Sequence, residues 1–124
     1  MTQFLAVAVG GAFGSALRYA TTLGATRMLG TGFPFGTMLV NVVGCLLAGL
    51  IFGLAEQRVG ISPVIRLLLL TGFLGGYTTF STFMVETVTL VQAGSWFAAF
   101  GSFLANSIAG AALAIAGIYI GRMI

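Results

Sequence analysis

The residues 71–83 hold side chains whose types and spacing could bind or guide an ion. They read Thr-Gly-Phe-Leu-Gly-Gly-Tyr-Thr-Thr-Phe-Ser-Thr-Phe. The pair Gly75-Gly76 weakens a helix, and the hydroxylated residues after it favour non-helical backbone. An interruption in apolar surroundings frees backbone groups, which persist only where protein, water or an ion satisfies them. The run therefore predicts a broken helix that is either an ion site or a glycine kink bonded by Thr and Ser hydroxyls.

Two phenylalanines follow the expected interruption. Phe80 and Phe83 are three positions apart, so they share one face of a helix. The edge of an aromatic ring is positive, and edges lining a narrow path could contact an anion without holding it tightly. An isolated pair of this kind would usually pack or face lipid. The interleaved Ser81 and Thr82 favour a role in conduction.

A few other polar side chains stand in apolar segments. Asn41 carries two amide donors, and Asn106-Ser107 stand together further along. Each could bond a neighbouring helix or donate to an anion, and the residues leave both interpretations open. Glu86 would repel an anion, so it must be neutralised, paired with an arginine or turned away from the path. A purely structural contact is an equal alternative for it.

The composition indicates which elements must position these residues. Hydrophobic residues make up 59% of the 124 and charged residues 6%, whereas soluble domains carry about a quarter charged residues. A lipid bilayer is therefore the expected surroundings. No clustered basic face exists, so no nucleic-acid partner is predicted. His and Asp are absent, which excludes a Ser-His-Asp triad and a His metal site, and no enzyme is predicted.

Four apolar stretches are long enough to cross a membrane, which takes about 20 residues of helix. They cover residues 4–23, 36–55, 63–91 and 96–120 of a single transmembrane channel domain, 1–124. The predicted fold is thus an all-α integral membrane protein. The third stretch would be ~43 Å long as one straight helix, longer than the hydrocarbon core, which agrees with a broken helix.

The arginines give the spans little preferred orientation. Both termini share a side, and that side would hold three arginines against two on the other, a slight bias. The three are Arg58, Arg66 and Arg122, and the two are Arg18 and Arg27. The chain is therefore predicted to insert in both orientations. Detection of a C-terminal tag on only one membrane face would reject this.

Three motifs resemble those of the Fluc (CrcB-type) fluoride channels. They are residues 72–83, residues 36–44 with Asn41 at their centre, and residues 14–19 with Arg18. The likeness covers nearly the whole chain, and the first motif is highly specific. It implies an antiparallel, dual-topology homodimer with two pores in the bacterial inner (plasma) membrane. Such proteins export fluoride passively and so lower its concentration and toxicity in the cytoplasm.

The resemblance also implies roles for particular residues. A sodium ion that is not transported would lie at the dimer centre, held by the backbone carbonyls of Gly75 and Thr78 from both subunits. Asn41 would be the asparagine of the pore, Phe80 and Phe83 would line the fluoride path, and Arg18 would lie near the aqueous vestibule. Hydroxyl groups would supply further donors along the path, from Thr79, Ser81, Thr82 and Ser107.

The fourth span departs from the family pattern. Phe103 and Ala111 stand where some members carry pore-lining hydroxyls, which leaves Ser107 as the expected polar member. Two other classes of membrane protein fit the sequence less well. A small multidrug exporter needs a buried glutamate early in the chain, and the first span has no acid. A non-transporting assembly subunit would not require the ordered run at residues 72–83.

Overall fold

The computed structural model describes residues 1–57 and 61–124, and the regular elements in these ranges are all helices. Four helical segments are long and apolar enough to cross a membrane, and their bounds are Thr2–Leu29, Phe35–Gln57, Pro63–Gln92 and Trp96–Met123. The prediction of four membrane-spanning helices is thus confirmed. Arg58, which was assigned to one side of the membrane above, lies outside the described residues.

The first two spans are continuous helices. Helix α1 (Thr2–Leu29) extends beyond the predicted 4–23 at both ends, and α2 covers Phe35–Gln57. Helix α1 ends at Gly30, whose φ of 83° lies in the left-handed region that favours glycine. The residues that connect it to α2 include Pro34, which lies directly before the first residue of α2.

The third span consists of four helical pieces. It begins with α3 (Pro63–Arg66), where the Ser62 hydroxyl accepts a bond from the Ile65 N–H at 3.3 Å. A π-helix, η1 (Leu67–Leu74), and one turn, α4 (Gly75–Tyr77), follow. After two extended residues the chain continues as α5 (Phe80–Gln92). The span is therefore interrupted, as the sequence predicted.

The fourth span is helical throughout but changes its winding. It consists of α6 (Trp96–Leu104), a five-residue π-helix η2 (Ala105–Ala109), and α7 (Gly110–Met123). A π-helix is wider than an α-helix and often marks a functional position. The wider turn contains Asn106 and Ser107, two of the polar residues singled out from the sequence.

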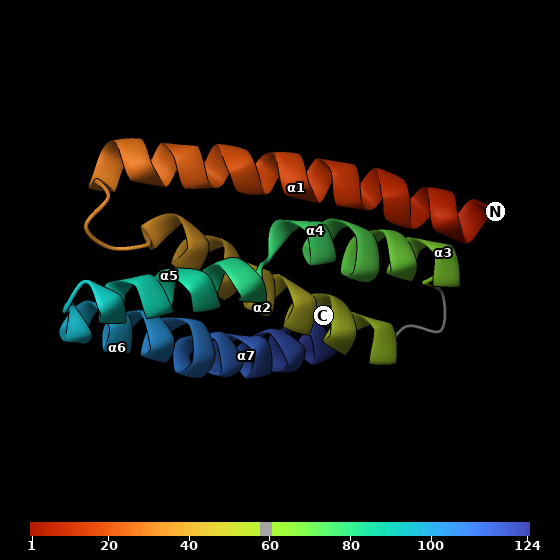
Figure 1. Ribbon diagram of the computed structural model, residues 1–124. Coiled ribbons are helices and arrows are strands. Elements are labelled where there is room, and N and C mark those ends of the chain that lie inside the picture. The colour runs from red at the N-terminus through yellow and green to blue at the C-terminus, as the bar shows by residue number, and fades with distance from the viewer. Residues whose placement is uncertain (58–60) are drawn as a thin grey trace.

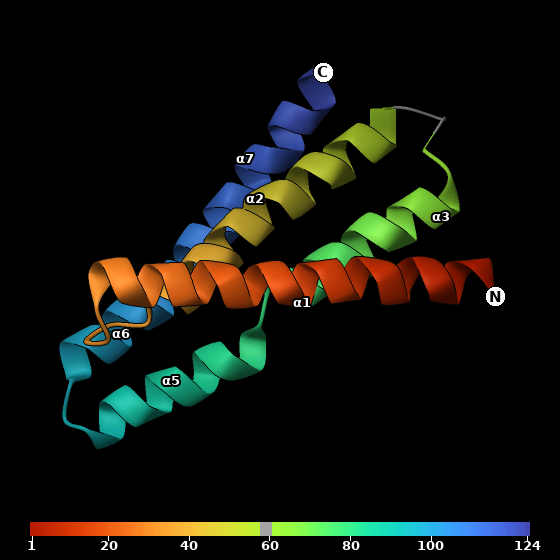
Figure 2. The ribbon, with the colours of Figure 1, turned by 90° about the horizontal axis from the view of Figure 1, so that it is seen from above.

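The helices pack in two pairs, and the interruption lies where the pairs meet. Helices α2 and α7 lie side by side, and α1 lies along η1 and α4 (Figures 1 and 2). Viewed from above, α1 crosses the third span close to the point where α4 ends and α5 begins (Figure 2). The N-terminus lies at the end of the bundle where α3 begins (Figure 1), and Arg122, near the C-terminus, pairs with Glu56 at the end of α2 at 2.8 Å. The middle of the bundle therefore surrounds the interruption.

Glycines bring the backbones of each pair into direct contact. A Cβ atom on Gly14 would meet the Phe73 carbonyl oxygen, and one on Gly76 would lie 2.6 Å from that of Gly11. In the other pair, a Cβ on Gly49 would meet the Ala114 carbonyl, and one on Gly117 would lie 2.8 Å from the Leu50 nitrogen. In lipid, such close packing is a main source of helix association. These small residues thus pack helices within one chain.

A candidate ion site at the interruption of the third span

Two threonines form the interruption. Thr78 (φ −86°, ψ 162°) and Thr79 (φ −154°, ψ 117°) are extended, whereas Gly75 is helical (φ −62°, ψ −35°). The predicted break is therefore present, and of its two local causes the hydroxylated residues, not the glycine pair, adopt the extended backbone. Gly76 is helical as well, and its missing Cβ atom allows the backbone of α4 to lie close to that of α1. The β-branched, hydroxylated residues that follow the pair adopt the non-helical backbone.

Asn41 bonds the interruption on both sides. The Thr79 backbone N–H donates to Asn41 Oδ1 at 2.8 Å, and Asn41 Nδ2 donates to the Thr79 carbonyl at 2.9 Å. The second Nδ2 hydrogen goes to Asn106 Oδ1 at 2.8 Å. Asn41 is 9% exposed, so these bonds replace water for groups that would otherwise be unsatisfied. On this chain Asn41 therefore bonds neighbouring helices, the first of the two alternatives given for it.

The carbonyls of Gly75 and Thr78 are among those that lose their helical donors at the interruption. In an unbroken helix the Gly75 carbonyl would accept from the Thr79 N–H, which here donates to Asn41. The Thr78 carbonyl would accept from the Thr82 N–H, which here donates to Thr79 Oγ1 at 3.3 Å. Arg18 Nη1, from α1, donates to the Thr78 carbonyl at 3.2 Å. The predicted vestibule arginine thus contacts the interruption directly.

The carbonyl oxygens of Gly75 and Thr78 are of the ligand type that the expected sodium ion would need. A hard cation prefers oxygen ligands, and carbonyls outside a helical ladder are available to it. Gly75 is exposed on this chain, and each carbonyl oxygen has a second lone pair.

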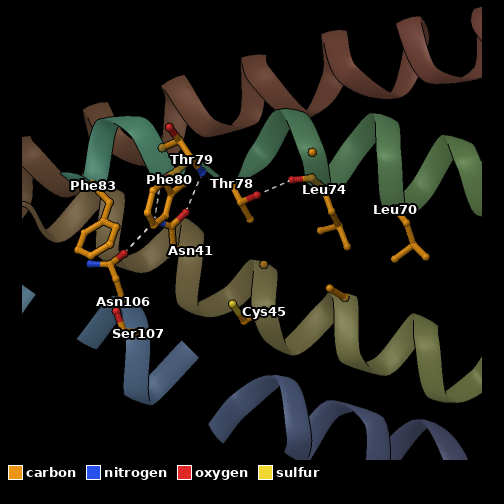
Figure 3. Close-up of a pocket in the computed structure, with 13 residues that line it drawn as sticks. Asn41, Cys45, Leu70, Leu74, Thr78, Thr79, Phe80, Phe83, Asn106 and Ser107 are labelled. Atoms are coloured by element: carbon orange, nitrogen blue, oxygen red, sulfur yellow. Dashed lines mark hydrogen bonds between the residues drawn. The ribbon is translucent and has the colours of Figure 1, made fainter. Parts of the chain in front are cut away.

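A cavity of about 480 Å³ lies beside the interruption (Figure 3). It is lined by seven of the ten residues that the sequence singled out as site residues: Asn41, Gly75, Thr78, Thr79, Phe80, Phe83 and Ser107. The remaining lining comes from Gly44, Cys45, Ala48, Leu70, Leu74 and Asn106. Apolar walls with a few polar groups gathered at one place are typical of a ligand site.

The two phenylalanines share the cavity but differ in burial. Their ring centroids are 5.7 Å apart with an interplanar angle of 71°, an edge-to-face arrangement. Phe83 is 3% exposed and also contacts the ring of Phe103 at 6.3 Å. Phe80 is 75% exposed on the single chain. One ring is therefore fixed by packing, and the other lies open for a further partner.

The hydroxyls mainly satisfy the backbone. Thr78 Oγ1 donates to the Leu74 carbonyl at 2.9 Å, and Thr79 Oγ1 caps α5 and donates to Thr82 Oγ1 at 3.0 Å. Ser81 and Thr82 are exposed and do not line the cavity. The first turn of α5 starts at the cavity, where the positive end of a helix favours an anion.

Asn106 is the main residue that the predicted site lacked. Its Nδ2 donates to the Ser102 carbonyl at 2.9 Å, which directs its oxygen at Asn41. The sequence did hold a signal for it, since a carboxamide inside a span needs a polar partner. Cys45, one turn from Asn41, also lines the cavity, but an apolar sulfur there carries no comparable signal.

Glu86 lies away from this cavity and is not paired with an arginine among the described residues. It lines a second cavity of about 280 Å³ together with five threonines: Thr22, Thr26, Thr31, Thr37 and Thr89. Among described residues, its buried Oε2 has no hydrogen-bond partner, and Thr37 is its hydroxyl neighbour. Of the alternatives for Glu86, the structure therefore agrees with a carboxyl group turned away from the interruption.

The comparisons with known proteins agree with this geometry. Residues 5–118 match the model of the family described as CrcB-like protein, Camphor Resistance (CrcB). The chain belongs to the CrcB-like family. A family member from Maridesulfovibrio salexigens is 45% identical over 124 residues, which is all of this chain and 98% of that protein. One from Chloroflexus aurantiacus is 42% identical over 122 residues, 98% of this chain and 97% of that protein.

A third CrcB-like relative, from Nitratidesulfovibrio vulgaris, is 43% identical over 124 residues, the full length of both proteins. All three carry the name fluoride-specific ion channel FluC. With four apolar helices, this CrcB-like chain is a multi-pass protein of the bacterial plasma membrane.

Proposed function

We propose that this protein is a fluoride-selective channel that exports fluoride passively and so lowers its concentration and toxicity in the cytoplasm. The observation that carries the proposal is the cavity at the interrupted third span. There the Asn41 amide, the positive end of α5 and two phenyl rings gather at one place. The names of the relatives add support, since each is called a fluoride-specific ion channel.

The chemistry of the cavity suits a small halide. Fluoride leaves water only if donors replace its hydration, and it moves on only if no group holds it too firmly. Amide and backbone donors meet the first need, because they attract an anion without a full positive charge. Phenyl edges from Phe80 and Phe83 meet the second, because their electrostatic attraction is weak.

We further propose that two copies form an antiparallel homodimer with dual topology. The exposed groups at the interruption support this, because Phe80 is 75% exposed and Gly75 is also exposed on the single chain. The nearly even distribution of arginines supports both orientations. In such a dimer each cavity would be closed by the second copy.

Sodium would be held at the dimer centre by the carbonyls of Gly75 and Thr78 from both copies. Its charge would stabilise four carbonyl oxygens brought together, and it would stay in place during conduction. Replacing sodium by N-methylglucamine is therefore expected to lower the melting temperature of the purified dimer and shift it towards monomer. The measurement is thermal unfolding with light scattering, and potassium serves as a second cation. Equal melting in all three salts would contradict a structural sodium site.

The test of the function is fluoride efflux from liposomes that contain the purified protein. Fluoride is expected to leave down its gradient when a potassium ionophore carries the compensating charge, whereas chloride stays inside. A fluoride electrode and a chloride electrode follow the two ions, with protein-free liposomes as control. Retention of fluoride at the level of the control, or release of chloride at an equal rate, would reject a fluoride-selective channel.

A further inference from the structure

The two donors of the Asn41 amide are committed in different ways. One hydrogen belongs to a two-point pairing, in which Asn41 donates to the Thr79 carbonyl and accepts from the Thr79 N–H at 2.9 and 2.8 Å. The other hydrogen goes to Asn106 Oδ1 at 2.8 Å, a single bond between two side chains (Figure 3). An anion that needs a donor from Asn41 must therefore displace one of these acceptors.

The two displacements differ in their consequences. The pairing of Asn41 with Thr79 anchors the interruption, because it satisfies backbone groups that have no helical partner. An anion that displaced the Thr79 carbonyl would break this anchor. Loss of Asn106 Oδ1 leaves that anchor intact and releases one amide hydrogen into the cavity. Both carboxamides line this cavity, and Phe83 lines it beside them. Its volume of about 480 Å³ has room for several waters at about 30 Å³ each, so the released oxygen can be hydrated.

We propose that Asn106 Oδ1 is an exchangeable internal acceptor that occupies the position of the halide at Asn41. A passing halide takes the Nδ2 hydrogen from Asn106, and Asn106 takes it back when the halide leaves. The position between the two carboxamides is thus a halide site closed by the protein itself when empty. This inference rests on the proposed channel function and assigns Asn106 a role that determines how firmly the halide is held.

The surroundings of Asn106 suit an acceptor that returns to one place. Its Nδ2 donates to the Ser102 carbonyl at 2.9 Å, and Ser102 is fully buried. The Ser102 hydroxyl lies 3.4 Å from that of Thr87, which donates to the Phe83 carbonyl at 2.8 Å. These bonds join Asn106 to α6 and α6 to α5, so they restrict how far the Asn106 oxygen can swing from Asn41.

The first test replaces Asn106 by leucine, which has a similar shape but no acceptor. In N106L the Asn41 hydrogen that in wild type bonds Asn106 Oδ1 has no internal acceptor, so a halide can bind it without displacing one. The fluoride concentration that gives half-maximal efflux is therefore expected to fall by about two- to tenfold, the worth of one hydrogen bond. The maximal rate is expected to fall as well, because a halide held more firmly leaves more slowly. The matched control is I108V, which alters an exposed residue of the same turn η2 that does not line the cavity and should keep the wild-type half-maximal concentration.

The second test gives the acceptor a charge that can be removed. In N106D a carboxylate would accept firmly from Asn41 and repel the halide, so efflux at high pH is expected to be blocked. Protonation would restore a donor towards the Ser102 carbonyl and an uncharged acceptor towards Asn41. Efflux is therefore expected to recover as the pH falls, after subtraction of the leak from protein-free liposomes. Wild type and I108V, which keep Asn106, should lack this recovery.

Other groups near the site do not change these expectations. Among the described residues, Cys45 is the one lining residue whose side chain titrates. Arg18 contacts Thr78 from the side of α1, and Glu86 lies three positions beyond Phe83 and lines the other cavity. All three are present in wild type, so the difference between N106D and wild type isolates the new carboxyl group.

The outcomes separate the failures. If wild type passes no fluoride, the channel proposal fails. If wild type conducts while folded N106L keeps the same half-maximal concentration, or N106D conducts equally at all pH values, the exchange proposal alone fails. If N106L does not elute as wild type on size exclusion, the pH series of N106D decides. Should N106D also misfold, Asn106 is a structural residue and the proposal is overturned.

Discussion

Replacement of Asn41 by aspartate is expected to stop fluoride efflux. The substitution keeps the shape and the acceptor for the Thr79 N–H but removes both hydrogens of the amide. The remaining carboxylate oxygen would then face the Thr79 carbonyl and Asn106 Oδ1, which now receive Asn41 Nδ2 at 2.9 and 2.8 Å. Three oxygens without a shared hydrogen repel one another, and the cavity gains a negative charge on the path of an anion.

The size of the effect follows from the charge. Two unit charges about 4 Å apart repel by about 4 kcal/mol at an effective dielectric of about 20. That energy corresponds to about a thousandfold in an equilibrium constant. Loss of the donors adds to it, because the halide then has no amide to replace its water. Efflux of N41D is therefore expected to fall to the level of protein-free liposomes.

A matched variant separates charge from loss of the anchor. N41L removes the donors and the acceptor without adding a charge, so it tests what the interruption loses when Asn41 is apolar. We expect N41L to retain a small fluoride efflux that N41D lacks at neutral pH, provided that both elute as wild type. Normal efflux through folded N41D would remove Asn41 from the path. Equal loss in both variants would show that the anchor, rather than the charge, is what conduction needs.

The interruption itself was predictable because its cause is local. Thr78 and Thr79 carry β-branched side chains with hydroxyls that compete for backbone bonds, and the span is too long for one straight helix. The exact residues of the break were harder to predict from the sequence. Gly75 and Gly76 disrupt helices in water, but here α1 packs against Gly76, where a Cβ would meet the α1 backbone. Tertiary packing thus overrides the local preference at the glycine pair.

The geometry around Asn41 depended on information that one sequence does not contain. Two π-helical segments change the register of the third and fourth spans, and no residue pattern marks their onset. The register at η2 decides that Asn106 lines the cavity beside Asn41. Its bond at 2.8 Å therefore follows from how two spans pack, although both carboxamides were visible as polar residues in apolar segments.

Replacement of Phe83 by isoleucine is expected to reduce fluoride efflux by about tenfold or more. Isoleucine keeps an apolar side chain at this buried position but leaves part of the ring's volume empty, so thermal unfolding of the variant is measured alongside. It removes a ring that lines the cavity and the edge-to-face contact with Phe80, at 5.7 Å and 71°. One lost contact of about 1.4 kcal/mol along the path corresponds to about a tenfold change in rate.

Phe103 provides the matched control for this substitution. Its ring contacts that of Phe83 at 6.3 Å, yet it does not line the cavity. F103I therefore removes a similar aromatic contact without removing a ring from the proposed path, and its efflux is expected to stay within about twofold of wild type, since such a pair contributes only about 0.5–1.5 kcal/mol to packing. Efflux is measured from liposomes with a fluoride electrode, at equal amounts of protein that elute alike.

The pair of variants decides between packing and conduction as the role of the ring. If F83I conducts as wild type does, the Phe83 edge is not needed by the halide, and the two rings serve only to close the bundle. If F83I and F103I lose efflux equally, the aromatic cluster acts through the position of α5. A loss confined to F83I, with unfolding in detergent unchanged between the two variants, places the ring edge on the path beside Asn41. The buried ring would then guide the halide past the donor amide.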